Sequence, residues 1–159
     1  MVRAREIKGM DGTMSFAEAA AVAIRTRAEE VFSFADGVLD ISDPERVHDM
    51  RVATRRLRAA LEIFAPCLRK REYKPLLREV KALADALGER RDPDVQIESL
   101  ERLSALLDDD ERAGVEALTD ELRANRQHGN ERVEQALERV RDCRLAERLD
   151  LLAAGALER

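Results

Sequence analysis

Residues 45–61 read ERVHDMRVATRRLRAAL, and this stretch decides the fold of the chain. When successive residues are placed about 100° apart, its apolar side chains gather on one side of a helix. That apolar side comprises Met50, Ala53, Leu57, Ala60 and Leu61, with Phe64 one turn further on. The opposite side carries His48, Arg51, Arg55 and Arg58 within about 80°, with Arg56 on the flank. We therefore expect a helix that buries one face and presents a column of positive charge on the other.

Capping residues, prolines and the spacing of apolar residues divide the rest of the chain into further helices. We expect helices over about residues 15–34, 44–64, 71–87, 93–108 and 111–152. Asp-Pro pairs at residues 43–44 and 92–93 are typical of helix starts, with the proline at the first helical position. Asp92 and Asp94 are accordingly expected to act as caps at a helix N-terminus, after Gly88 has ended the preceding helix.

The composition indicates an all-α protein. Of the 159 residues, 45% are hydrophobic, 38% are charged and only 3% are aromatic, a balance that favours exposed helices over a sandwich or Rossmann domain. Short connections favour an antiparallel up-and-down bundle of four to six helices, depending on whether Gly129 breaks the last segment. We expect one domain over residues 15–155, preceded by a flexible segment over residues 1–14. Its expected core contains Met50, Leu57, Leu61, Phe64, Leu76, Val80, Leu83 and Leu87, and Phe16 and Phe34 also fall at core-facing positions.

Location in the cell can be inferred from what the sequence lacks. No stretch approaches the roughly 18 apolar residues that cross a bilayer, and the first residues contain no apolar core of a secretory signal. Cys67 and Cys143 are far apart in the sequence and are typical of the thiols of a reducing compartment. We expect a cytoplasmic protein with no membrane contact.

Positive charge is concentrated in one part of an acidic chain. The net charge is −5, yet residues 46–91 contain 13 Lys and Arg against 6 Asp and Glu, a balance of +7. The remainder holds 15 basic and 27 acidic residues, a balance of −12. A basic block of this kind indicates a localised site for an anion. The alternative is that the acidic helices neutralise the block within the fold.

A second basic stripe follows the first along the chain. Arg71, Lys74, Arg78 and Lys81 share one face of the next helix, opposite its apolar residues. Two antiparallel neighbours would place the two stripes side by side, where like charges repel unless a polyanion or the carboxylates of another chain lie between them. A charged helix face that is merely solvated remains the competing interpretation.

Residues 46–61, RVHDMRVATRRLRAAL, resemble the signature of the CHAD family, the conserved histidine α-helical domain. Residues 87–95, LGERRDPDV, resemble the second landmark of that family, at the expected spacing from the first. The resemblance implies a helical bundle that binds inorganic polyphosphate through a basic surface and has no catalytic activity. The residues that it implies for binding are His48, Arg51, Arg55, Arg56 and Arg58 from the signature, Arg91 from the second landmark, Lys74, Arg78 and Lys81 from the following basic helix, and Arg126 and Arg132 from the late part of the unit.

The chain departs from the family in its length. Family members commonly contain two such four-helix units around a basic channel, whereas this chain has one signature helix. We therefore expect a homodimer that polyphosphate tightens, because a second copy would supply the missing half of the channel. Association with polyphosphate granules is a further expectation from the same resemblance.

Motifs for catalysis are missing from the sequence. Gly88 stands alone without a glycine-rich phosphate loop, and the two histidines and two cysteines lack metal-ligand spacing. We expect no catalytic residue, no metal and no cofactor. Two other functions stay open, a module that binds nucleic acid and one that binds an acidic protein. The scarcity of aromatic residues favours polyphosphate over nucleic acid, since single-strand binders stack bases on aromatic side chains.

Overall fold

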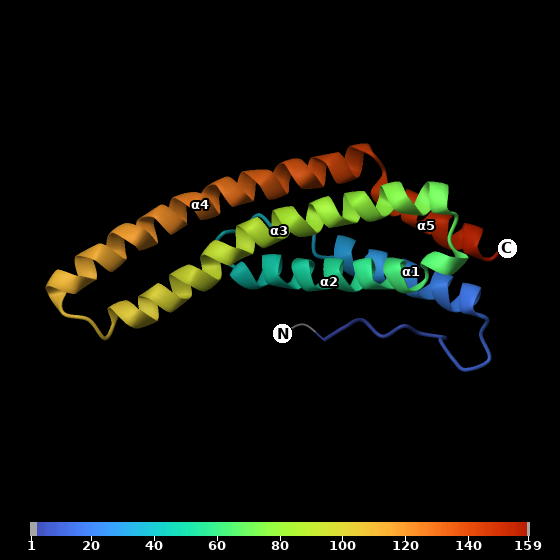
Figure 1. Ribbon diagram of the computed structural model, residues 1–159, viewed down its shortest axis with the longest axis horizontal. Coiled ribbons are helices and arrows are strands. Elements are labelled where there is room, and N and C mark those ends of the chain that lie inside the picture. Colours follow the sequence, from blue (N-terminus) through green and yellow to red (C-terminus); the bar gives the residue numbers. More distant parts are fainter. Residues whose placement is uncertain (1–2, 159) are drawn as a thin grey trace.

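The computed structural model describes residues 3–158, which form five α-helices packed as a bundle (Figure 1). The helices are α1 (Phe16–Phe32), α2 (Pro44–Ile63), α3 (Lys70–Ser104), α4 (Asp109–Asp142) and α5 (Leu145–Ala156), and a short 3₁₀ turn, η1 (Ala65–Cys67), joins α2 to α3. The described residues contain no strand. The predicted all-α fold is confirmed. Residues 1 and 2 of the predicted flexible segment lie outside the described residues.

The α3–α4 hairpin is much longer than the other helices. α2 has 20 residues, whereas α3 has 35 and α4 has 34. One end of the hairpin therefore projects beyond the N-terminal end of α2, as Figure 1 shows. We call this projecting part, residues 92–128, the arm. The rest of the hairpin packs with α1, α2 and α5 into the body of the bundle.

The core lies in the body, where the apolar faces of all five helices meet. Seven of the eight predicted core residues are buried in one cluster: Met50, Leu57, Leu61, Leu76, Val80, Leu83 and Leu87. The eighth, Phe64, is half-buried at the end of α2, where its ring centroid lies 4.9 Å from that of Phe16. The prediction that Phe16 faces the core is wrong, because this ring is 52% exposed at the start of α1. Phe34 packs against the edge of the core, as expected.

The helix break predicted at residues 88–93 is wrong, since α3 runs without interruption through Gly88 and Pro93. Asp92 and Asp94 therefore cap no helix. Pro93 is buried inside α3, where it has no N–H to donate to the carbonyl of Glu89. That carbonyl oxygen faces Gly129 of α4, at 3.2 Å from where a Cβ would stand. Tertiary packing against α4 thus outweighs the local cost of a proline in the helix.

Gly129 does not break α4, contrary to the alternative considered from the sequence. It is buried where α4 crosses α3, and a Cβ at this position would lie only 2.9 Å from the Cα of Arg90. The glycine therefore allows two backbones to approach closely. The break in the predicted 111–152 helix lies instead at Arg144, whose φ of 52° is left-handed and which separates α4 from α5.

The start of α2 agrees with the sequence prediction. Pro44 is its first residue, and Asp43 occupies the N-cap position. The Asp43 side chain makes no capping hydrogen bond, however. It accepts a hydrogen bond from Nε of Arg46 at 3.0 Å, so the aspartate contributes through charge.

Candidate anion-binding surface

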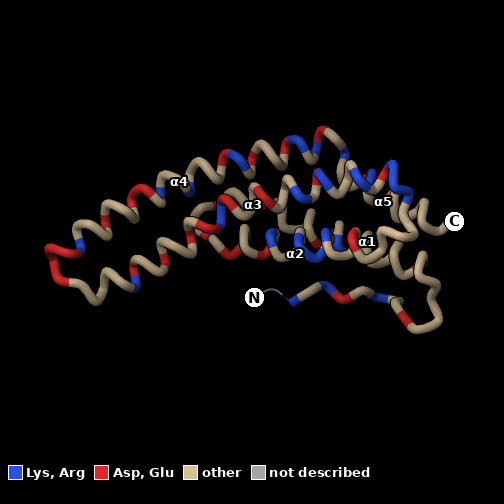
Figure 2. The backbone as a smooth tube through the Cα atoms, in the orientation of Figure 1, with Lys and Arg blue, Asp and Glu red and all other residues tan. Residues whose placement is uncertain are grey.

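Helices α2 and α3 bring the two basic stripes together, as predicted. The Nε of Arg51 on α2 lies 3.8 Å from where a Cβ would stand on Gly88 of α3. One ion pair joins the same helices, because Glu62 Oε1 of α2 lies 3.4 Å from Lys81 Nζ of α3. The same oxygen lies 3.5 Å from Arg58 Nε within α2. Both contacts fit one antiparallel register. We call the resulting surface the basic face, which comprises His48, Arg51, Arg55 and Arg58 of α2 and Lys74, Arg78 and Lys81 of α3. Figure 2 shows the positive residues of these two helices alongside one another.

Most cations of the basic face have no acidic partner. Among residues 3–158, no carboxylate lies within 4.0 Å of Arg51, Arg55, Lys74 or Arg78. Glu62 supplies the ion pairs that the described structure gives this face, and it serves Arg58 and Lys81 together. Arg55, Arg58, Lys74 and Arg78 are exposed, whereas Arg51 is half-buried against α3. The acidic helices therefore do not neutralise this surface, and the corresponding alternative from the sequence fails here.

Arg56 faces the other way, toward α1. Its Nη1 donates to Oε1 of the buried Glu30 at 2.8 Å. Burial of Glu30 raises the pKa of its carboxyl group, but hydrogen bonds from the Arg5 backbone and Arg27 and the charges of Arg27 and Arg56 outweigh burial. The net effect lowers the pKa, and Glu30 is held as a carboxylate. The structure thus gives Arg56 a role in joining α1 to α2 and does not bring it into the basic face.

His48 and Arg91 lie at the end of the basic face nearest the arm. In the register that places Arg51 opposite Gly88, His48 is level with Arg91. Both side chains are half-buried. Nε of Arg91 is buried and has no hydrogen-bond partner among the described residues.

Arg126 and Arg132, the late basic residues, are separate from this face. Nη1 of Arg126 lies 3.7 Å from Asp94, at the root of the arm. Nη1 of Arg132 pairs with Glu89 at 2.6 Å across the α3–α4 interface. Neither residue is placed beside the cations of α2.

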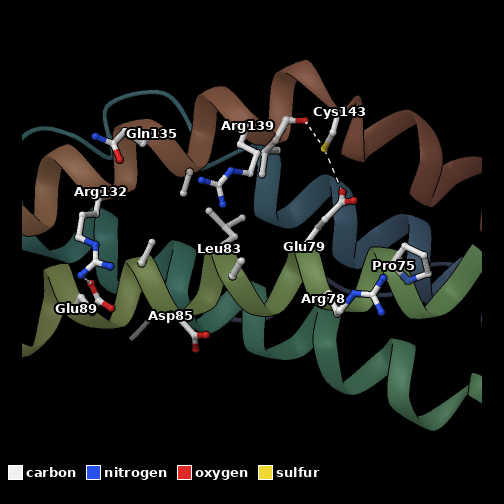
Figure 3. A pocket seen from close by; sticks show the side chains of 14 residues that line it. Pro75, Arg78, Glu79, Leu83, Asp85, Glu89, Arg132, Gln135, Arg139 and Cys143 are labelled. Atoms are coloured by element: carbon white, nitrogen blue, oxygen red, sulfur yellow. Dashed lines mark hydrogen bonds and ion pairs between the residues drawn. The ribbon is translucent and has the colours of Figure 1, made fainter.

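A groove of about 510 Å³ runs between α3 and α4, next to the basic face. Figure 3 shows Arg139 extending from α4 over this groove, with Arg78 on the opposite rim. Arg139 was missed by the sequence analysis. The signal was present, because Arg139 follows Arg132 by seven residues and so lies on the same side of α4.

The far end of the groove is occupied by a hydrogen-bonded cluster around Glu79. Nη1 of Arg148 lies 2.9 Å from both carboxylate oxygens of Glu79, and Sγ of Cys143 donates to the same carboxylate at 3.1 Å. Burial and the hydrogen bond to Glu79 raise the pKa of the Cys143 thiol. The thiol is therefore protonated at neutral pH and is a weak nucleophile.

The family profile of the CHAD domain matches residues 22–159 of this chain. The chain belongs to the CHAD-domain family. CHAD domains are associated with polyphosphate binding and generally have no catalytic activity. No curated protein and no solved structure matches the chain.

The second CHAD landmark, residues 87–95, is mainly structural in this chain. Leu87 is buried in the core, and Gly88 lies against Arg51, whose Nε would be in ordinary van der Waals contact with a Cβ at this position. Arg90 is fully buried, donates to Asp94 Oδ2 at 2.6 Å and to Asn130 Oδ1 at 3.2 Å, and so ties α3 to α4. Helical periodicity could not predict this buried pair, because it places no arginine in a core.

Two other kinds of site are not found in the described part of the CHAD chain. No group of three or more His, Cys, Asp or Glu side chains is placed to hold a metal ion. No helix is long and apolar enough to cross a membrane. The basic face is therefore the strongest candidate for a functional site among residues 3–158.

Proposed function

We propose that this CHAD chain binds inorganic polyphosphate on the basic face without catalysing a reaction. The observation that carries the proposal is the set of four cations, Arg51, Arg55, Lys74 and Arg78, that have no carboxylate partner among the described residues. Four positive charges on two packed helices repel one another. An anion bound along them would replace that repulsion with attraction.

The geometry of the face suits a linear polyanion. Along α3, the face extends from the level of Lys74 to that of Gly88, which at 1.5 Å per residue is about 20 Å. Arginine donates paired hydrogen bonds to phosphate oxygens, and lysine adds a mobile point charge. A chain of phosphates could therefore contact cations of both helices along the seam between them.

The aromatic residues give little support to nucleic acid as the ligand. Single strands bind on exposed aromatic rings that stack with bases. Phe16 is exposed but packs against Phe64 at the end of α2, and Tyr73 is half-buried. Neither ring is both exposed and free of a ring partner, so a bare phosphate chain fits the surface better than a base-bearing one.

A competition titration tests the choice of ligand. Labelled polyphosphate bound to the protein is displaced by unlabelled polyphosphate, single-stranded DNA, RNA or an acidic protein, each compared at equal charge concentration. We expect polyphosphate to be the strongest competitor, and its affinity to fall steeply as salt rises because bound phosphates release counterions. Stronger displacement by RNA, DNA or the acidic protein, or an affinity independent of salt, would contradict the proposal.

Two finer expectations from the sequence stay predictions. One is the homodimer expected from the sequence, which encloses polyphosphate between two basic faces and is tightened by it; it is the alternative to the dimer inferred below, which polyphosphate dissociates. The other is a cytoplasmic location in association with polyphosphate granules. Both depend on the proposed ligand, and dimerisation is tested directly by the experiment described in the next section.

A further inference from the structure

The arm and the basic part of the chain carry equal and opposite charge. Residues 92–128 contain 4 arginines and 11 acidic residues, a balance of −7, whereas residues 46–91 have a balance of +7. Figure 2 shows acidic residues at the tip of the arm, where residues 108–111 are four consecutive carboxylates. The rest of the chain is acidic, so the net charge is −7 in the arm and +2 in all other residues together, and the positive charge is concentrated on the basic face.

The negative surplus of the arm is accessible. Each of its four arginines already has an acidic partner within the arm, so the excess charge is wholly carboxylate. Glu111, Glu116 and Glu121 on α4 are exposed and have no basic partner within 4.0 Å among the described residues. The arm thus has unpaired anions, as the basic face has unpaired cations.

The arm cannot reach the basic face of its own chain. α3 runs as one continuous helix from the basic face into the arm, and the hydrogen bond from the buried Arg90 to Asn130 and the close Gly129 contact fix α4 against it. A helix of this length does not fold back on itself. The complementary charges can meet only between two copies of the chain.

We propose that the acidic arm of one copy docks on the basic face of a second copy, in a reciprocal two-fold dimer that polyphosphate dissociates. When two copies lie antiparallel along α3, the arm of each copy lies on the basic face of the other. A two-fold axis makes these two contacts equivalent. The lengths agree, because the α3 part of the arm, residues 92–104, spans about 20 Å, as the basic face does.

Docking and polyphosphate binding use the same cations and exclude each other. The arm acts as a tethered polyanion that covers Arg51, Arg55 and Arg58 until a ligand of higher charge density replaces it. The competition rests on the proposed function, whereas the self-association does not. This arrangement also differs from the dimer expected from the sequence, which polyphosphate would tighten.

Sedimentation velocity of the full chain at high micromolar concentration tests the docking. Two variants have the same change in charge on the same helix: E111K/E116K/E121K in the arm, and the matched control E131K/E134K/E138K in the body, whose glutamates are also exposed and unpaired in the described structure. We expect the parent and the control to be dimers at low ionic strength and monomers at high salt, and the arm variant to be a monomer throughout. A parent that is monomeric at low salt, or an arm variant that still dimerises, would overturn the proposal.

A charge swap keeps the test decisive if one variant folds poorly. The face variant R51E/R55E/R58E and the arm variant E111K/E116K/E121K should each be monomeric, and their mixture should form a one-to-one heterodimer. Circular dichroism checks that both keep the parent's helicity. A mixture of two folded variants that stays monomeric would contradict docking of the arm on the face.

Adding polyphosphate separates this inference from the proposed function. We expect polyphosphate to convert the parent dimer to monomers and to bind the arm variant at least as tightly as the parent. A dimer that polyphosphate tightens would overturn the proposed competition. A salt-sensitive dimer that fails to bind polyphosphate would refute the proposed function and leave the docking intact.

Discussion

The basic face and the arm are built from the same kind of helix but differ in how their arginines are neutralised. In the arm, Arg102, Arg112, Arg123 and Arg126 each have an acid within 4.0 Å, at distances of 2.8 to 3.9 Å. On the basic face, Arg51, Arg55, Lys74 and Arg78 have none among the described residues. The difference shows that the number of arginines on a surface does not identify an anion site. The absence of acidic partners around them does.

The local sequence explains this difference. Three of the arm's arginines follow or precede an acid by three or four residues, the spacing at which helical side chains meet. At the same spacings, Arg55 has Arg51, Val52, Arg58 and Ala59 as neighbours. Arg78 has Lys74, Pro75, Lys81 and Ala82. Like charges at these spacings each destabilise a helix by about 0.2–0.5 kcal/mol, so the face has a cost in stability that a bound anion would offset.

The largest effect on stability is expected at the root of the arm. Asp94→Ala would leave Arg90 buried without its charged partner and should lower the free energy of unfolding by about 3–5 kcal/mol. Asp92→Ala, two residues away and exposed, serves as the matched control and should have little effect. Urea unfolding followed by circular dichroism measures both. Equal losses in the two variants would show that the Arg90–Asp94 pair does not hold the arm to the body.

Two adjacent arginines should behave oppositely. Arg56→Ala removes a hydrogen bond to the buried Glu30 and should cost about 1–3 kcal/mol at neutral pH. Arg55→Ala removes two like-charge contacts, with Arg51 and Arg58, and should therefore raise stability by up to about 1 kcal/mol while it weakens polyphosphate binding. The lowered pKa of Glu30 means that its charged contacts stabilise the fold above the ordinary glutamate value of about 4.3, and that this stabilisation is lost as the pH falls through the lowered value. The loss in free energy of unfolding that Arg56→Ala causes should therefore be smaller in acid than at neutral pH.

Urea titrations of the two variants at several pH values measure this difference. Parent-like stability of Arg56→Ala at pH 7, or a cost that grows in acid, would contradict the assignment of Arg56 to the α1–α2 contact. Loss of stability in Arg55→Ala would place Arg55 in the fold and not in the site.

Glu62→Gln should have the smallest effect, and one of opposite sign. Glu62 neutralises Arg58 and Lys81, so its removal makes the basic face more positive and should tighten polyphosphate binding by about two- to fivefold. Glu72→Gln removes one of the two acidic partners that Arg69 has among the described residues, outside the face, and should change the affinity less. Calorimetric titration of both variants decides this, and weaker binding by Glu62→Gln would mean that Glu62 orients the site.

Much of the fold follows from local patterns in the sequence. The start of α2 at Pro44 and the apolar faces of α2 and α3 depend on residues within a few turns of one another, and these were predicted correctly. The helix break at Pro93 was predicted wrongly, because the backbone of Glu89 and Arg90, one turn before the proline, packs against Gly129 of α4, 39 residues after Arg90 in the sequence. Local propensity contains no information about such a contact.

The candidate site was also predicted only in part from the sequence. The angular positions of Arg51, Arg55 and Arg58 on α2 predicted that they share a face, and the contacts with α3 place the second stripe beside them. The sequence could not show that Arg56 turns to Glu30 on α1, since periodicity gives an angle and not a partner. The full burial of Arg90 could not be predicted from periodicity either, because it depends on hydrogen bonds to both Asp94 and Asn130.

The central claim is that unpaired cations, and not positive charge in general, make the anion site. Two variants with equal change in net charge test it most directly: R51E/R55E/R58E on the basic face and R102E/R112E/R123E in the arm. Affinity for long-chain polyphosphate is measured at physiological salt, where charges further than about 8 Å apart are largely screened, and at protein concentrations at which the chain is a monomer, so that docking of the arm does not compete with the ligand. We predict a loss on the order of 100-fold for the face variant and little change for the arm variant. Equal losses in the two variants, or parent-like binding by the face variant with its helicity intact, would contradict the account.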